Sequence, residues 1–352
     1  MNIYLFLFHN IVGDNMSHMI NLNNKNLRTD LLIENVINSN NIKVDDNISV
    51  TDIKLNEEMG KTINKKKGRY ITISYKDITD YNNKINVIKT FTKEFSKLLK
   101  EINIKDTDKV LIVGLGNINI VADSLGAKTT NNILVTKHLF DINEVEEGFR
   151  CVSILNPSVK GLTGIETHTH ILSLVKEERP DILIVIDALA SSSIARVTKT
   201  IQMSTAGINP GSGVSNSRKE ISFETIGLPV ISVGVPTVVD AATIVSDTIT
   251  NLYKHFTYTK DNINNPMNKL LISNINYLKK DISINKEDKE KIFGIVGLLN
   301  EDETKKLISE VLSPTGYNMI VTPKEVDYEI DLLSNIISTG INKSLHKKVN
   351  HI

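Results

Sequence analysis

The sequence has 352 residues, enough to bury a hydrophobic core in one large domain or two, and its 41 basic and 41 acidic side chains cancel to a net charge of zero. A balanced charge argues against a general nucleic-acid-binding protein, which needs surplus basic side chains to release counterions from phosphates. The single cysteine, Cys151, excludes an intrachain disulfide and fits a reducing, cytoplasmic compartment.

The first 30 residues are predicted to form a flexible leader, because they are polar, rich in asparagine and weakly periodic. The apolar run IYLFLF at residues 3–8 is too short to span a bilayer. It also lacks the basic flank and the cleavage site of a signal peptide, so we expect no membrane association. Met16 is a second candidate start, with residues 1–15 as an extension.

Residues 31–352 are predicted to form one α/β domain. KKKGRYITISY at residues 65–75 indicates a strand, and residues 86–102 have the apolar spacing of a helix. Further strands are predicted at VLIVGLG, NILVTKHL, CVSILNP, DILIVIDAL and PVISVGVP, and helices at GIETHTHILSLVKEE and TVVDAATIVSDTITNLYKHF. Near-continuous apolar strands that alternate with helices predict a mainly parallel sheet covered by helices on both faces.

The C-terminal part differs in composition. Residues from about 258 to 290 are polar and predict a loop or an excursion, and residues 291–352 are predicted to be helical. TPKE at residues 322–325 has Thr, Pro and Glu in the N-cap, N1 and N3 positions of a helix start, and NEDE at residues 300–303 is a weaker signal of the same kind.

Two carboxylates are predicted at the carboxyl ends of buried strands, where open α/β sheets bind ligands. Asp123 follows the strand VLIVGLG, and Asp187 follows ILIVI. If these strands are near neighbours, the two side chains can share one proton and act as general acid and general base. The alternative is that Asp187 caps a helix and Asp123 is a solvated loop residue.

Other motifs carry weaker signals. GLGN lacks the third glycine of a dinucleotide-binding fingerprint, and NPGSGVSNSR at residues 209–218 lacks the Lys-Ser/Thr ending of a P-loop. His138 is predicted to follow a strand at the same end of the sheet as the two aspartates, so a metal held by Asp123, Asp187 and His138 is an alternative. No histidine or cysteine spacing is typical of a zinc site.

The motifs VLIVGLGN, ADSLG, TKHL, TGIET, IDALA, TIQ, GINPGSGVSN, ETIGLPV, VGVPTVVDA and VTPKEVD occur in this order, and RTDL and KKKGRY precede them. From about residue 27 to the C-terminus, the sequence resembles the germination proteases of spore-forming bacteria. These endopeptidases degrade small acid-soluble spore proteins.

The resemblance implies a fold similar to that of hydrogenase-maturation proteases, with extra N-terminal and C-terminal elements. It implies an atypical aspartic-type endopeptidase without metal or cofactor, a homotetramer in the cytoplasm of the forespore or spore core, and a zymogen that trims its own N-terminus. The family's essential acids map onto Asp123 in ADSLG and Asp187 in IDALA. The sequence departs from the family pattern near both, with VADSLGA and LASS in place of TPDALGP and LAAR.

The resemblance also implies cleavage after an acidic residue and before a large apolar one. RTDLLIE resembles such a substrate, so the leader is expected to be cut between Asp30 and Leu31. A basic pocket should accept the acidic residue, and the candidate substrate-binding residues are Lys137, His138, Arg196 and Arg218. Two alternatives stay open: a catalytically weak or silent relative, and a metal-dependent hydrolase on the same fold.

Overall fold

The computed structural model describes residues 29–35, 41–211, 218–262, 282, 286–312 and 319–350. Its centre is a mixed sheet with the strand order β1-β2-β3-β7-β8-β6-β4-β5, and β9 pairs with the end of β8. The strands are β1 (Asn41–Lys43), β2 (Ile48–Leu55), β3 (Gly68–Tyr75), β4 (Val110–Gly114), β5 (Val152–Leu155), β6 (Ile182–Ser191), β7 (Thr200–Ser204), β8 (Val230–Asp240) and β9 (Ile320–Val321).

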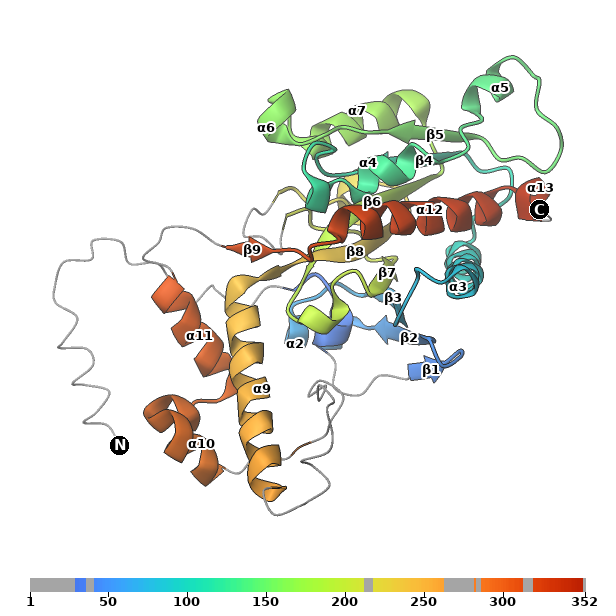
Figure 1. Cartoon of the computed structure of the whole chain (residues 1–352). Helices are drawn as coiled ribbons and strands as arrows, with labels where there is room; N and C mark the ends of the chain where they lie inside the picture. Colours follow the sequence, from blue (N-terminus) through green and yellow to red (C-terminus); the bar gives the residue numbers. More distant parts are fainter. Residues whose placement is uncertain are drawn as a thin grey trace.

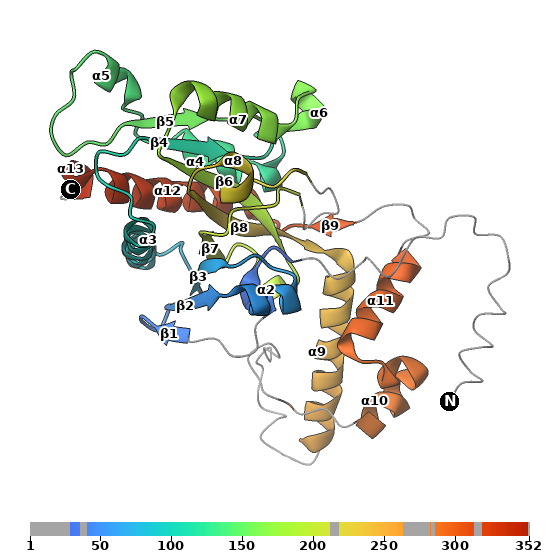
Figure 2. The same ribbon diagram turned by 180° about the vertical axis from the view of Figure 1, so that it is seen from behind.

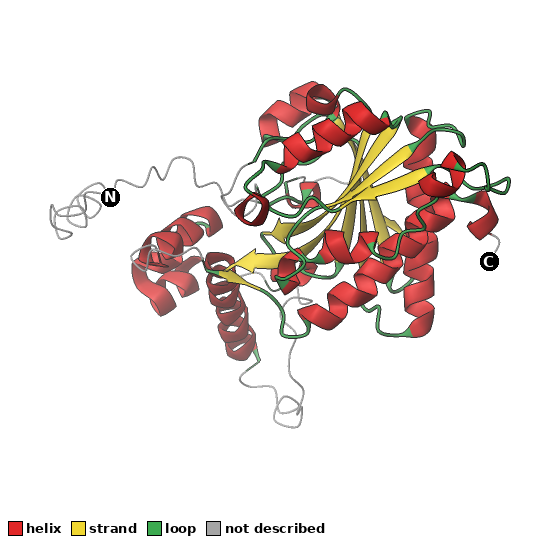
Figure 3. Ribbon diagram, turned by 90° about the horizontal axis from the view of Figure 1, so that it is seen from above, coloured by secondary structure: helices red, strands yellow, loops and turns green. Residues whose placement is uncertain are grey.

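Helices cover both faces of this sheet, as Figures 1 and 3 show. They are α2 (Glu57–Ile63), α3 (Tyr81–Glu101), α4 (Leu125–Thr130), α5 (Lys137–Asp141), α6 (Lys160–Thr163), α7 (Thr167–Glu178), α8 (Phe223–Ile226), α9 (Ala241–Asp261), α10 (Lys286–Phe293), α11 (Glu301–Leu312), α12 (Val326–Leu345) and α13 (Lys347–Asn350). The predicted α/β class with helices on both faces is confirmed.

The parallel part of the sheet consists of β8, β6, β4 and β5. Its strands are apolar on both faces because side chains alternate between two cores. In β4, Ile112 faces the core that contains α3 and α12, whereas Leu111 and Val113 face the core that contains α7 and α8. The expected parallel arrangement therefore holds for this half of the sheet, which carries the candidate site.

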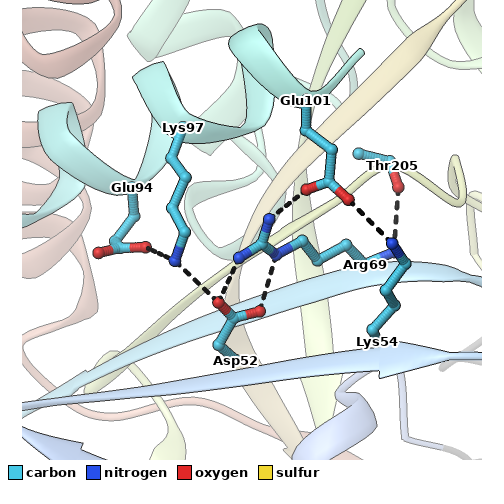
Figure 4. Close-up of polar contacts among 7 residues, drawn as sticks. All are labelled: Asp52, Lys54, Arg69, Glu94, Lys97, Glu101 and Thr205. Carbon is cyan, nitrogen blue, oxygen red and sulfur yellow. Dashed lines mark hydrogen bonds and ion pairs between the residues drawn. The ribbon is translucent and has the colours of Figure 1, made fainter.

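The other half of the sheet is antiparallel, because β1, β2, β3, β7 and β8 follow one another in alternating directions. A charged cluster ties it to α3 (Figure 4). The Arg69 guanidinium donates two hydrogen bonds to Asp52, at 2.8 and 2.6 Å, and also pairs with Glu101. The Arg69 backbone N–H donates to Thr205 Oγ1 at 3.0 Å, directly after β7. The cluster thus fixes β7 against β3.

The long helices α9 and α12 are placed differently. Helix α12 lies along the sheet and packs on α3, whereas α9 extends away from the sheet beside α10 and α11 (Figures 1 and 2). Helix α9 covers the first residues of the expected polar excursion, and residues 263–281 and 283–285 lie outside the described part. The division into a leader of residues 1–30 and one domain of residues 31–352 stays a prediction, since residues 1–28 are also outside it.

Two local predictions in the C-terminal part have different outcomes. The NEDE signal forms a reciprocal capping box, in which the Glu303 N–H donates to Asn300 Oδ1 and the Asn300 N–H donates to Glu303 Oε2, both at 2.9 Å. The TPKE prediction is wrong, because α12 begins at Val326. The Thr322 hydroxyl donates instead to the Thr237 carbonyl of β8, at 2.9 Å, so a long-range contact replaces the helix cap.

The strand predicted at NILVTKHL is also wrong. Residues 131–136 form turns and extended chain, and Lys137 and His138 begin the short helix α5. The apolar side chains there differ in exposure, since Ile133 is buried and Leu134 is exposed. An apolar run of this length does not by itself distinguish a strand from a loop that packs against the core.

Candidate functional site

Asp187 is a buried carboxylate within β6. This strand continues to Ser191, four residues beyond Asp187, while its parallel neighbour β4 ends at Gly114, opposite Ile186. Asp187 therefore lies just past the end of β4, and only 6% of its surface is exposed. The Ala188 N–H donates to Asp187 Oδ1 at 2.9 Å. Burial raises the pKa of Asp187 well above its ordinary value, and the charges of Asp123 and Asp30 raise it further.

Asp123 reaches the same edge of the sheet through a tight turn after β4. Gly116 has a φ of +93°, and a Cβ there would lie 2.0 Å from the Asp123 carbonyl oxygen. Asp123 ends a 3-10 helix, Val121–Asp123, and its Oδ2 accepts the Asn117 N–H at 2.7 Å. Burial raises the pKa of Asp123, and the Asn117 hydrogen bond and the charge of Arg218 oppose this.

The turn that carries Asp123 is held close to the strands of the site. The Thr237 hydroxyl of β8 donates to the Ala122 carbonyl at 2.7 Å and so holds the Asp123 turn against the sheet. The Asp123 charge acts on Asp187 in a desolvated environment, and two neighbouring negative charges disfavour each other. The pKa of each acid is therefore raised, which is the direction that a combined acid and base requires.

The described segment at residues 29–35 docks beside Asp187. Asp30 forms two hydrogen bonds with Ala190 of β6: its N–H donates to the Ala190 carbonyl at 3.1 Å, and its Oδ2 accepts the Ala190 N–H at 2.8 Å. Gln202 of β7 donates from Nε2 to the Asp30 carbonyl at 3.2 Å and accepts the Leu32 N–H at 2.7 Å. The predicted cleavage point thus lies against the sheet near the carboxylate pair.

The remainder of this segment is firmly packed. Leu31 and Leu32 are fully buried, and Leu32 packs against apolar side chains of β2 and β3. The Glu34 carboxylate accepts hydrogen bonds from the Ser191 hydroxyl at 2.6 Å, the Ser192 hydroxyl at 2.7 Å and the Ser192 N–H at 2.9 Å. The serine run after Asp187, which has no evident role in the sequence, therefore holds Glu34.

A cavity of about 1040 Å³ lies beside Thr29 and Asp30. The half-buried Lys65 lines this cavity, and its ammonium group donates to the Thr29 carbonyl at 2.7 Å. Burial lowers the pKa of Lys65, while the nearby Asp30 and Glu34 charges raise it. The cavity also borders Gln202 and Gly234, so it leads to the sheet beside Asp187.

The structure brings together some of the candidate substrate-binding residues and separates others. Arg196 lies with its Nε 3.6 Å from Glu34 Oε1, and the Arg218 charge lowers the pKa of both Asp123 and Asp187. Lys137 and His138 instead follow Thr136, whose N–H bonds to Val152 at the start of β5. They therefore lie at the opposite end of the parallel strands, because the predicted strand before them is absent.

Sequence reasoning missed Lys65 and Gln202. Lys65 belongs to the KKKGRY motif, which indicates a strand but not which lysine contacts the segment at residues 29–35. Gln202 is the only glutamine in the sequence and lies in the short strand β7, which was not predicted. The only signal was the TIQ motif.

The residues that the structure describes contain no candidate metal centre and no candidate membrane span. Within those ranges, no three His, Cys, Asp or Glu side chains are grouped as metal ligands would be. None of the helices in the same ranges has the length and hydropathy needed to cross a bilayer.

Comparisons with known proteins give a consistent family. The family model described as germination protease matches residues 15–352. The germination protease of Priestia megaterium is 43% identical over 316 residues, which cover 87% of this chain and 85% of that protein. The germination protease of Bacillus licheniformis is 46% identical over 313 residues, covering 86% and 85%.

Among solved structures, a [NiFe] hydrogenase maturation protease from Thermococcus kodakarensis aligns with a TM-score of 0.27 and 16% identity. The alignment covers 40% of this chain and 80% of that one. The family assignment depends on the sequence matches, which extend over nearly the whole chain. The chain belongs to the germination protease family.

Proposed function

We propose that this protease is an atypical aspartic-type endopeptidase in which Asp123 and Asp187 activate water and protonate the leaving group. The observation that supports this most directly is the carboxylate pair itself. Asp187 is buried, Asp123 is close enough to raise its pKa, and the substrate-like segment at residues 29–35 is bonded to Ala190 three residues further along the same strand.

The surroundings of the two acids suggest their roles. Asp187 is the more buried and carries the shared proton, whereas Asp123 accepts the Asn117 N–H, which favours its charged form. Asp123 then removes a proton from water as the water oxygen adds to the peptide carbonyl carbon. Asp187 donates its proton to the departing nitrogen as the C–N bond breaks. The pair ends with one proton, as it began.

The substrates that fit this proposal are small acid-soluble spore proteins, cleaved after an acidic and before a large apolar residue. Asp30 and Leu31 supply this pair within the chain, so the protein is made as a zymogen that removes its own leader. The docking of Asp30 on Ala190 and Gln202 supports cleavage at this bond. The family resemblance further supports a homotetramer in the cytoplasm of the spore core.

The test is to replace each acid by its amide, which keeps the shape of the side chain and removes its titration. Asp123→Asn and Asp187→Asn should each lower cleavage of a purified small acid-soluble spore protein by about 10²- to 10⁴-fold, the range for a general acid or base. N-terminal sequencing should find Leu31 as a new terminus only in the wild type.

Asp331→Asn is the matched control, because Asp331 is exposed and pairs with Lys128 on the outside of α12. Residual activity within about tenfold of wild type in either site variant would be too much for the proposed role.

Chelation tests the metal-dependent alternative, in which the protein would lose activity and regain it with a divalent cation. Wild-type protein that cuts neither substrate nor leader would be a silent relative.

A further inference from the structure

Gln202 lies across β8 from Asp187, at the same level of the sheet. Gly234 of β8 pairs with Asp187 on one side and with Gln202 on the other. Residues paired directly across strands project from the same face, and two strand spacings separate their Cα atoms by roughly 10 Å. Gly234 places no side chain between them, and a Cβ there would meet Leu189 at 2.6 Å. The Leu189 side chain therefore packs over Gly234, on the face shared by Asp187 and Gln202.

The Gln202 side chain holds the backbone on both sides of the Asp30–Leu31 bond. Its Oε1 accepts the Leu32 N–H at 2.7 Å, and its Nε2 donates to the Asp30 carbonyl at 3.2 Å. A backbone N–H is only a donor, so the amide oxygen must face Leu32 and the NH₂ group must face the carbonyl. The side chain is 8% exposed, which limits its freedom to reorient.

We propose that Gln202 is a further catalytic residue, which stabilises the negative charge that develops on the carbonyl oxygen of the bond being cut. This inference rests on the proposed function and on cleavage after Asp30. When the water oxygen bonds to the carbonyl carbon, the electron pair of the C=O bond moves to oxygen. The Gln202 N–H already points at that oxygen and needs no reorganisation, the condition under which such donors contribute most. As the pair returns and the C–N bond breaks, Asp187 supplies the proton to nitrogen.

Lys65 has a different part in the same site. It binds the carbonyl of Thr29, one residue before the one attacked, at 2.7 Å. No charge develops on that oxygen during the reaction, so Lys65 is a positioning residue. The two side chains therefore make distinct predictions: loss of Lys65 loosens docking of the segment, whereas loss of the Gln202 donor slows the chemical step.

Self-cleavage of the full chain measures these effects. Gln202→Glu keeps an oxygen acceptor for the Leu32 N–H but removes the donor. It should slow the appearance of the Leu31 terminus by about 100-fold, the typical cost of one such donor. Hydrogen–deuterium exchange at Leu32 should stay as slow as in wild type. The rate should partly recover at low pH, where the introduced carboxyl group is protonated and donates again. Lys65→Met should instead speed exchange at residues 29–31.

Gln202→Met provides a second variant, since it removes both contacts; it should slow cleavage and also expose Leu32 to exchange. Because Gln202 is the only glutamine, glutamine-selective ¹⁵N labelling gives a single side-chain amide signal, which should shift when the leader leaves.

If folded Gln202→Glu or Gln202→Met cleaves within about threefold of wild type, the inference is wrong while the proposed function stands. If the wild type never yields the Leu31 terminus, the self-processing part of the proposal fails and this inference fails with it.

Discussion

Asp123 and Asp187 are placed at one site by different local structures. The sequence predicts the placement of only one of them. Asp187 follows five consecutive apolar residues of a buried strand, so its burial and position near a sheet edge were predictable. Asp123 depends on a turn in which Gly116 adopts a positive φ and the Asn117 N–H binds the carboxylate. Sequence pattern predicts that some turn follows β4, but not the direction in which its side chains project.

Arg218 allows a test of the shared proton at the level of one residue. Its charge lowers the pKa of both acids, so Arg218→Gln should raise both. A raised pKa keeps the singly protonated, active pair populated to higher pH, so the alkaline limb of the kcat/KM profile should move to higher pH. Arg179→Gln, an exposed change after α7, is the control. A limb that stays in place or moves to lower pH would contradict the pairing of Arg218 with this site.

At the scale of elements, the segment at residues 29–35 shows what sequence analysis could and could not supply. The acidic–apolar pair Asp30–Leu31 was found by its resemblance to a substrate. Its partners were not found, because Ala190, Gln202 and Lys65 are 36 to 172 residues away in the chain. The partners of Glu34 are equally distant, since its carboxylate binds the serines after β6.

The contact between α12 and α3 is a second feature set by one residue. A Cβ on Gly340 of α12 would lie 2.2 Å from Cδ1 of the fully buried Phe91 of α3. Gly340→Ala should therefore destabilise the protein by about 1–3 kcal/mol through overpacking, even though alanine favours a helix. Urea unfolding measures the change. Gly161→Ala is the matched control, because nothing lies within 4 Å of its Cβ. Equal stability of the two variants would mean that the helices separate without cost.

For the whole molecule, the parallel half of the sheet is the part of the fold that was predicted most fully. Buried apolar strands β4, β5, β6 and β8 and helices α3, α7 and α9 were predicted near their observed positions, because burial on both faces leaves a strong pattern. In the antiparallel half, strand β3 was predicted from KKKGRYITISY, whereas strand β7 was missed. Strand β7 has five buried residues that include threonine, glutamine and serine, so neither alternation nor an apolar run marks it. Partner strands and the Arg69 cluster define this strand, and both are non-local.

Helix α12 runs along the sheet from its site end to the opposite end (Figure 1). His346 follows α12 directly and contacts Arg150, just before β5. His346 is fully buried, and its Nδ1 accepts the backbone N–H of Arg150 at 3.1 Å. A nitrogen that accepts a hydrogen bond carries no proton, so the ring is neutral. Burial lowers the pKa of His346, a hydrogen bond with the Leu134 backbone opposes this, and the Arg150 charge lowers the pKa further. In the unfolded chain, histidine has its ordinary pKa of about 6.5. Just below this pH, His346 therefore binds a proton in the unfolded chain but stays neutral in the folded chain.

This difference makes global stability depend on pH with a defined sign. Because the unfolded state binds more protons, the free energy of unfolding should fall as pH drops below about 6.5, by up to roughly 1.4 kcal/mol per pH unit until the folded pKa is reached. His346→Asn keeps an acceptor near the Arg150 N–H but does not titrate. Urea unfolding at pH 7.5 and 5.5 should show a smaller loss in this variant than in wild type. His255→Asn, on the exposed part of α9, should leave the wild-type loss unchanged. An equal loss in wild type and His346→Asn would mean that His346 is protonated without cost in the folded protein.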